Sequence, residues 1–241
     1  MTEKTLTRPA RRSPLPAQDD ATGSQDAVYE RIVQAVMEHR LPPGTKLVEE
    51  KLATVFKISR TRVREVLARL AHEQLVNAIP NRGSFVASPT VEEALQIFDA
   101  RRIIEPALAR QLVAQASSGD IRRLREHVVR ERAARDADDR RAIIRLSGEF
   151  HLLIADMVGN PPLQRLMREL ASLTCLIIVL YDKPSVPACP NHEHSAFIDA
   201  IEARDEARAV AAMLEHLQHI QETLDLSQDD GPDIDLEAIF A

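Results

Sequence analysis

The apolar residues near the start of the chain recur with a helical period. Every fourth residue from Val28 to Val36 is apolar, which predicts a helix over residues 25–39. Two shorter helical patterns follow, one over residues 49–56 and one that starts at Ser59. Because only two residues separate these patterns, they predict a helix-turn-helix.

The second helix of this pair is amphipathic, and its polar side is basic. Its apolar stripe consists of residues at helical spacing, namely Val63, Val66, Leu67 and Leu70. Ser59 is placed to cap its first N–H groups, and the polar side carries Arg60, Arg62, Arg64 and Arg69. Cations at a helix N-terminus oppose the helix dipole, so this placement predicts contacts with the phosphates and base edges of DNA. The alternative is a solvated basic helix without a DNA partner.

A hairpin pattern follows this helix. Residues 75–79 and 84–86 are mainly apolar runs that flank Pro-Asn-Arg-Gly at residues 80–83, which predicts two strands joined by a basic turn. Such a hairpin behind a helix-turn-helix is a wing, so residues 25–87 are predicted to form a winged helix-turn-helix DNA-binding domain. A short break at residues 88–90 separates this domain from the rest of the chain.

From residue 91 onward the patterns are helical, without strand-like alternation. Six helices are predicted, over residues 91–117, 120–135, 138–158, 163–181, 191–203 and 205–224. The expected fold class is therefore mainly α, with the winged domain followed by an all-α bundle over residues 91–226. Residues 1–24 and 227–241 are predicted to be a disordered tail and an acidic tail.

Composition is consistent with a helical protein. The chain is 44% apolar and 28% charged but only 3% aromatic, which is typical of helical proteins rich in Leu, Ala and Arg. Basic residues exceed acidic ones by four in residues 1–90, whereas acidic residues exceed basic ones by ten in residues 91–241. This asymmetry is typical of a nucleic-acid-binding module joined to a domain with another task.

The cysteine and hydropathy patterns bear on location. Cys175 and Cys189 are too few for a disulfide framework, which favours a reducing cytoplasm. No run approaches the roughly 18 apolar residues of a membrane helix, and the first residues lack the apolar core of a secretory signal. A cytoplasmic protein without a membrane partner is expected.

The winged block also carries a set of short motifs. They are LPPGTKL at residues 41–47, LA at 52–53, SRTRVREVL at 59–67, LV at 75–76 and RGSFV at 82–86. In this order the block resembles the amino-terminal domain of the GntR family of bacterial transcription regulators. The resemblance implies that Arg60, Thr61 and Arg64 contact operator DNA, with Arg82 and Gly83 at the wing.

Two positions depart from the usual pattern of that family. Arg62 stands where many members have proline, and Glu50 stands where many have an arginine that touches DNA. Arg62 is expected to add a phosphate contact, which brings it into the predicted DNA-binding set. The contact at position 50 is not expected here.

The second part of the chain carries motifs of its own. They are RRIIEP at residues 101–106, FH at 150–151, GNPPL at 159–163, EH at 193–194 and AMLEHL at 212–217. These motifs resemble the FCD domain that accompanies the GntR winged helix in the FadR subfamily, a bundle of six or seven helices. The resemblance implies a small organic acid as effector.

Three histidines are candidates for a metal site. His151, His194 and His216 lie on three predicted helices, each beside the apolar stripe of its helix. If they converge inside the bundle, neutral imidazoles would suit zinc, nickel, copper or iron. The alternative is that each is a hydrogen-bonded core or boundary residue.

The metal-binding FCD proteins add an aspartate one turn before the first of these histidines. Ser147 occupies that position here. A hydroxyl supplies no charge to a divalent cation, so a metal held by the three histidines is expected to bind less tightly than in an aspartate-containing member. Water or a carboxylate of the ligand would complete the coordination.

Other residues are candidates for the organic acid. Arg101 is expected either to bind a carboxylate or to form a salt bridge, and Arg102 to form a salt bridge. Asn160 is interpreted as a loop or cap residue, with ligand contact as the alternative. The predicted ligand-binding set is Arg101, Ser147 and Asn160.

Three functions compete at this point. The first is a homodimeric, ligand-responsive transcription regulator, in the usual sense of the family a repressor, which binds an inverted-repeat operator. The second is a DNA-binding regulator that does not respond to a ligand and whose body only dimerises. The third is a metal-dependent enzyme, against which stands the absence of any nucleophile or phosphate-loop signature.

Overall fold

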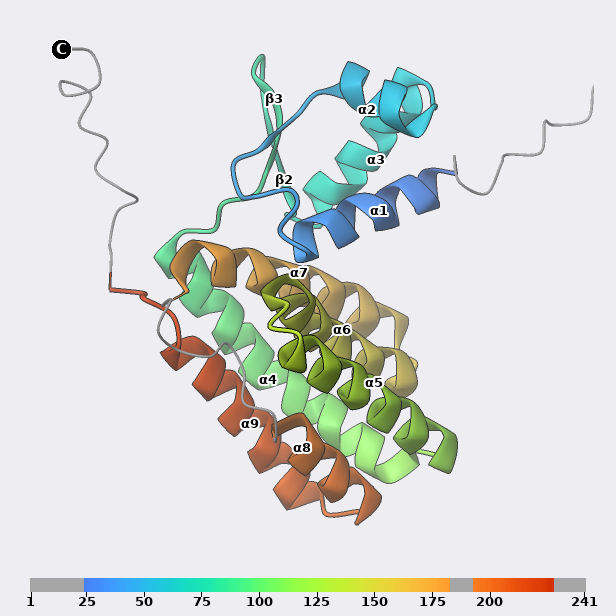
Figure 1. Cartoon of the computed structure of the whole chain (residues 1–241), viewed down its shortest axis with the longest axis vertical. Coiled ribbons are helices and arrows are strands. Elements are labelled where there is room, and N and C mark those ends of the chain that lie inside the picture. The colour runs from blue at the N-terminus through green and yellow to red at the C-terminus, as the bar shows by residue number, and fades with distance from the viewer. Residues whose placement is uncertain (1–23, 183–192, 228–241) are drawn as a thin grey trace, which may run out of the picture.

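The computed structural model describes residues 24–182 and 193–227. Figure 1 shows the blue and cyan N-terminal part at one end and the green-to-red helices packed side by side as a bundle below it. The predicted class, a winged helix-turn-helix followed by an all-α bundle, is confirmed. The predicted tails, apart from Ser24 and Ser227, lie outside the described residues, as does Cys189.

Three helices build the N-terminal part, namely α1 (Gln25–Met37), α2 (Glu49–Phe56) and α3 (Arg60–His72). Ser59 Oγ accepts a hydrogen bond from Arg62 N at 3.3 Å, which is the predicted cap of α3. Lys57 adopts a left-handed φ of 55° and makes the tight turn between α2 and α3. The predicted apolar stripe of α3 is buried and consists of Val63, Val66, Leu67 and Leu70.

The wing is a three-stranded antiparallel sheet in the order β1-β3-β2. The predicted hairpin is β2 (Val76–Ile79) paired with β3 (Gly83–Val86). The third strand, β1 (Lys46–Leu47), pairs with the other edge of β3 and was not predicted. Two residues are too few to show the alternation by which a strand is recognised.

The bundle contains six helices within the described residues, as predicted. They are α4 (Val91–Gln115), α5 (Ser118–Asp136), α6 (Arg140–Val158), α7 (Pro161–Tyr181), α8 (Glu193–Glu202) and α9 (Glu206–Glu222). Thr90 and Ser117 form capping boxes that fix the starts of α4 and α5. None of the described helices has the length and apolar content needed to cross a membrane.

Helix α1 packs on α6 and α7, so the two parts of the chain share apolar packing. Met37 at the end of α1 is 4% exposed and belongs to the same buried cluster as Cys175 of α7. Next to it, Arg145 Nε of α6 lies 3.4 Å from Glu38 Oε1. The winged part is therefore attached to the bundle by packed side chains as well as by the linker.

Candidate DNA-binding surface and metal centre

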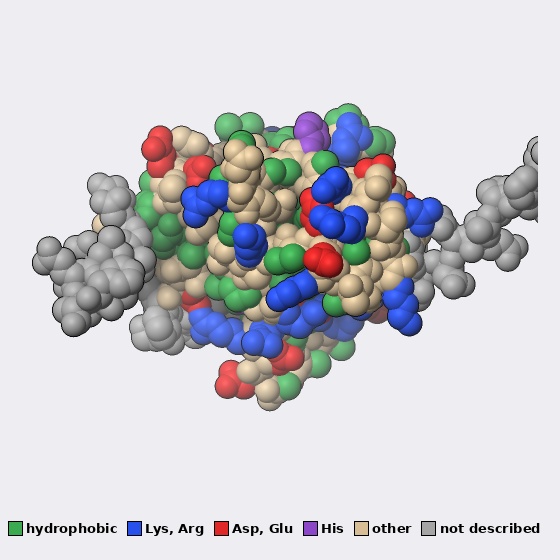
Figure 2. All heavy atoms as spheres, turned by 90° about the horizontal axis from the view of Figure 1, so that it is seen from above, with side chains coloured by type: hydrophobic (Ala, Val, Ile, Leu, Met, Phe, Trp, Pro, Cys, Tyr) green, Lys and Arg blue, Asp and Glu red, His purple; other side chains and the backbone are tan. Residues whose placement is uncertain are grey.

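The arginines of α3 lie on its outward side. The side chains of Arg60 and Arg64 are 60% and 63% exposed, Thr61 is exposed, and Arg62 is partly buried. Figure 2 looks onto this end of the molecule and shows basic side chains spread over it, with acidic side chains among them. The exposed first turn of α3 has the shape and charge to enter the major groove, which is wide enough for a helix.

Glu49, at the start of α2, binds two of these arginines. Its Oε2 atom lies 2.7 Å from Arg64 Nε and 3.6 Å from Arg60 Nη2. Sequence reasoning missed this pairing because Glu49 and Arg64 are 15 residues apart, and only the turn between the helices brings them together. A surface ion pair is worth about 0–1 kcal/mol, so phosphates or bases can replace the carboxylate at little cost.

The wing holds the other two predicted DNA contacts. Arg82 and Gly83 are both exposed at the turn between β2 and β3. Arg82 N donates to Ile79 O at 3.0 Å, and Asn81 and Gly83 have positive φ angles of 61° and 101°. Glycine tolerates such an angle without strain. DNA contact by these residues and by the first turn of α3 stays a prediction.

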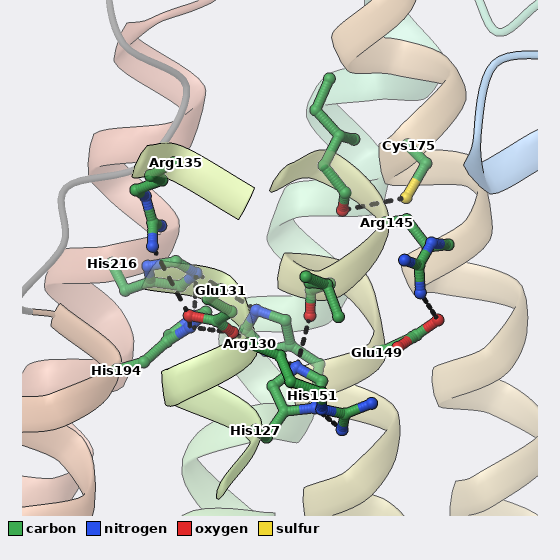
Figure 3. A network of polar contacts seen from close by, with 12 residues as sticks. His127, Arg130, Glu131, Arg135, Arg145, Glu149, His151, Cys175, His194 and His216 are labelled. Carbon is green, nitrogen blue, oxygen red and sulfur yellow. Dashed lines mark hydrogen bonds and ion pairs between the residues drawn. The ribbon is translucent and has the colours of Figure 1, made fainter. Parts of the chain in front are cut away.

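Three buried histidines converge in the bundle, which is one of the two arrangements that the sequence left open. His151 comes from α6, His194 from α8 and His216 from α9, and each is at most 3% exposed. His216 Nε2 lies 3.1 Å from His151 Nε2 and 3.2 Å from His194 Nε2. Figure 3 shows this cluster with Glu131 beside it. Residues from three helices are thus brought to one point.

Each of the three imidazoles has a carboxylate at its other nitrogen. The Nδ1 atoms are 2.5 Å from Glu105 for His151, 2.9 Å from Glu131 for His194, and 2.7 Å from Glu193 for His216. An ionised carboxylate can only accept, so Nδ1 carries the proton and Nε2 carries a lone pair. All three lone pairs therefore face the same region.

Burial keeps these histidines neutral. It lowers the pKa of His151 and of His216 to about 4, and it lowers the pKa of His194 as well. Burial alone would raise the pKa of Glu105, but the charge of Arg101 and the contact with His151 hold that pKa at about 2. Neutral imidazole beside ionised carboxylate is the protonation state that metal ligation requires.

The donor set fits a transition metal. The candidate ligand atoms of the three histidines lie within 4.8 Å of one another. Imidazole nitrogen suits zinc, nickel, copper or iron, whereas magnesium and calcium prefer oxygen. Among the described residues this group contains no carboxylate, and Ser147, one turn before His151 on α6, is 6% exposed and offers a hydroxyl.

Arg101 lies beside the histidines and is 1% exposed. Its Nε is 2.5 Å from Glu105 Oε1 and its Nη1 is 3.1 Å from Thr174 Oγ1, so the predicted salt bridge is present. Its Nη2 has no hydrogen-bond partner among the described residues. With Ser147 and His151, Arg101 lines an internal cavity of about 10 Å³, which is no larger than one water requires.

Two further candidates have structural partners. Arg102 Nη1 forms the predicted salt bridge with Asp99 Oδ1 at 2.9 Å and also contacts Gln221. Asn160 Oδ1 accepts a hydrogen bond from Leu163 N at 3.4 Å and caps α7. Asn160 is therefore a helix cap, as one of the two interpretations expected, and contact of Asn160 with a ligand stays a prediction.

Sequence reasoning missed the carboxylates that bind the histidines. Glu193 directly precedes His194, and Glu105 lies one helical turn after Arg101, so both were close to residues already singled out. Glu131 is 63 residues from His194 and no spacing rule links them. Only the packing of α5 against α8 brings this pair together.

Comparisons with known proteins match both parts of the chain. Residues 24–86 match the bacterial regulatory proteins of the gntR family, and residues 96–219 match the FCD domain. The HTH-type transcriptional repressor RspR of Escherichia coli (strain K12) is 25% identical, over 82% of this chain and 87% of that protein. The HTH-type transcriptional repressor NanR of Salmonella newport (strain SL254) is 28% identical, over 90% of each.

Solved structures match the fold. That of E. coli McbR/YncC has a TM-score of 0.72 at 19% identity and covers 82% of this chain and 95% of its own. A GntR transcriptional regulator from Rhodococcus sp. RHA1 has a TM-score of 0.70 at 22% identity, with the same coverage. At these identities the likeness concerns the arrangement of the helices and the wing alone.

Proposed function

The chain belongs to the GntR family of bacterial regulatory proteins and carries an FCD domain, and from this premise we propose that it is a homodimeric repressor controlled by a small organic acid. It is a DNA-binding transcription regulator and not an enzyme, since the family consists of regulators. We assign residues 25–87 to DNA binding and residues 91–226 to ligand binding and dimerisation.

In this proposal α3 of each subunit enters the major groove at one half-site of an inverted repeat. Arg60, Thr61 and Arg64 contact bases and phosphates, Arg62 adds a phosphate contact, and the wing contributes Arg82 and Gly83. The exposure of Arg60, Thr61 and Arg64 supports this assignment, because these side chains are accessible to DNA and the two arginines have only an exposed ion pair with Glu49 to exchange.

The bundle in this proposal holds a divalent metal such as zinc or nickel through Nε2 of His151, His194 and His216. When bound, the metal supplies a Lewis acid that attracts a carboxylate oxygen. The observation that supports an acid ligand is at Arg101, whose buried Nη2 has no hydrogen-bond partner among the described residues. A buried unsatisfied donor is unfavourable, and a carboxylate would offset that cost with a charge-assisted hydrogen bond. Ser147 offers a further polar contact in the same cavity.

The same cavity suggests how the acid would act on DNA binding. At about 10 Å³ it must expand to admit an organic ligand. Its walls include Gly148 and Cys175, and Met37 of α1 lies against Gly148. Expansion of the cavity would therefore displace α1, which is a core helix of the DNA-binding domain. The linker at residues 87–93 would transmit the same shift between the two domains. The acid then controls affinity by favouring one arrangement of the two domains.

Thermal unfolding against a panel of small organic acids tests this function, because a ligand of the folded state raises the melting temperature. We expect a carboxylate to raise it in the wild type, to do so less after chelation, and to have no effect in Arg101→Ala. A shift that Arg101→Ala retains would contradict the assignment of Arg101. An unchanged melting temperature across the panel would favour a regulator whose bundle only dimerises.

A further inference from the structure

One arrangement is repeated around the three histidines. Each Nδ1 meets a carboxylate, and the three carboxylates come from three different helices, namely Glu105 on α4, Glu131 on α5 and Glu193 on α8. Glu105 and Glu131 are each 2% exposed. A buried carboxylate is expensive unless it is well paired, so two such residues at one cluster, with the partly buried Glu193 as a third partner, require a common explanation.

The lone pairs give that explanation. With its proton on Nδ1, no imidazole has a proton at Nε2 to share with its neighbour. The Nε2 atoms nevertheless lie 3.1 and 3.2 Å apart, so their lone pairs repel one another unless a cation lies between them. The carboxylates thus hold each histidine in the tautomer with its proton on Nδ1. Without a metal this tautomer is unfavourable because the Nε2 lone pairs repel one another, whereas a shared metal would bind all three lone pairs.

The charges of the cluster point in the same direction. Arg101 Nε lies 2.5 Å from Glu105 and Arg135 Nη1 lies 3.8 Å from Glu131. Among the described residues, two arginines thus pair directly with two of the three carboxylates, while the three imidazoles are neutral. Arg130 contacts His127 rather than a carboxylate. The excess negative charge favours a divalent cation at the centre, although no carboxylate among the described residues joins the group of three histidines itself.

We propose that Glu105, Glu131 and Glu193 are positioning residues that hold the three histidines with Nε2 turned inward and supply the negative charge that a ligand set of neutral nitrogens lacks. This inference rests on the proposed metal site. It adds that a metal can bind without an aspartate at position 147, because the charge is provided one hydrogen bond farther out.

Glu131 offers the sharpest test, because both of its oxygens lie 2.9 Å from Nδ1 of the proposed ligand His194. Glu131 also lies 3.3 Å from Nε2 of His127, which is not a proposed ligand. Glu131→Leu removes both the acceptor and the charge, whereas Glu131→Gln retains an acceptor oxygen of the same shape. Glu149→Leu is the matched control, since Glu149 pairs with Arg145 on α6 and lies outside the cluster. All are made in the full-length chain, with Zn²⁺ alone as the probe.

Two measurements are needed. Competition with a chromophoric chelator gives the Zn²⁺ dissociation constant, and long-range ¹H–¹⁵N spectra of metal-free protein labelled at histidine report which ring nitrogen carries the proton. We expect Glu131→Leu to weaken Zn²⁺ binding by about 10- to 100-fold and to move the His194 proton from Nδ1 to Nε2. Glu131→Gln should keep the proton on Nδ1 and lose less affinity, and Glu149→Leu should match the wild type.

The outcomes separate the inference from the function on which it rests. If the wild type and both Glu131 variants bind Zn²⁺ equally well, the inference is wrong and the metal site remains. If His194 carries its proton on Nε2 in the wild type, the positioning role is also wrong. If the wild type binds no Zn²⁺, the proposed metal site itself is wrong, and the inference is overturned with it.

Discussion

The methyl group of Met37 in α1 lies against the backbone of Gly148 in α6. A Cβ atom on Gly148 would come within 2.9 Å of Met37 Cε and 3.1 Å of Cys175 Sγ, closer than such atoms normally approach. A side chain at position 148 would therefore require the ends of Met37 and Cys175 to shift. Gly148 also lines the cavity beside Arg101, so this contact joins the DNA-binding part to the proposed ligand site.

Gly148→Ala is expected to destabilise the protein through this contact, by about 1 kcal/mol, because the added methyl requires Met37 and Cys175 to move from their packed positions. The cost should fall in a Met37→Ala background, where the opposing side chain is gone. Urea unfolding of the wild type, the two single variants and the double variant gives the coupling energy, expected to be about 0.5 kcal/mol or more. Equal costs of Gly148→Ala in both backgrounds would show that the two residues do not interact.

Arg64→Ala is expected to abolish recognition of the operator while leaving the dimer intact. Arg64 is exposed on α3, and a guanidinium can make a bidentate contact with guanine that is worth about 1–3 kcal/mol of discrimination. Fluorescence anisotropy compares binding to a selected operator and to a scrambled duplex. Arg69→Ala is the control, since Arg69 lies on the same helix but pairs with Asp26 and Glu73. Equal operator affinity of Arg64→Ala and wild type would refute the assignment.

Glu49→Gln is expected to strengthen binding to non-specific duplex DNA, up to about fivefold, because it releases Arg60 and Arg64 from an exposed ion pair worth about 0–1 kcal/mol. Glu50→Gln removes the same charge one residue along the helix and is the matched control. Titration of each variant with duplex DNA at several salt concentrations separates the release of the two arginines from the general effect of net charge. If both variants gain equally, only the net charge matters and Glu49 has no special relation to the arginines.

Local signals predicted most of the fold, and long-range contacts account for what was missed. The Ser59 cap lies three residues from its partner, and the stripe of α3 follows one helical period, so spacing alone revealed both. Strand β1 exists only because Lys46 meets Phe85 across the sheet, and Glu131 meets His194 only through packing of α5 on α8. Patterns at fixed spacing report local geometry, whereas such pairings depend on how whole elements pack.

The fold is expected to lose stability in mild acid through His39, at the end of α1. Burial, and after it the charges of Arg140 and Arg141, lower the pKa of His39 from 6.5 to about 4. Between these values the unfolded chain binds a proton that the folded chain does not. The free energy of unfolding is therefore unaffected by protonation of His39 above pH 6.5. It falls as the pH drops from 6.5 toward 4, by at most about 1.4 kcal/mol per pH unit.

Replacing His39 isolates this contribution from that of the other histidines. His39 has a φ of 55°, which asparagine tolerates, so His39→Asn is the variant of choice. Urea unfolding at about pH 7 and about pH 5 should give a smaller loss of stability for the variant than for the wild type. Identical losses would mean that His39 is protonated equally in the folded and unfolded chains.

His194→Ala is expected to reduce the metal content of the protein strongly, because it removes one of only three nitrogen ligands in the described cluster. The control is His219→Ala: His219 lies three residues from His216 on α9, and its side chain is 40% exposed and 3.3 Å from Glu193. Purified proteins are loaded with Zn²⁺, desalted and analysed for metal per subunit. His219→Ala should retain the wild-type content. Equal metal in His194→Ala and wild type would place the metal elsewhere, and the convergence of the three imidazoles would then have to be explained by packing and hydrogen bonding alone.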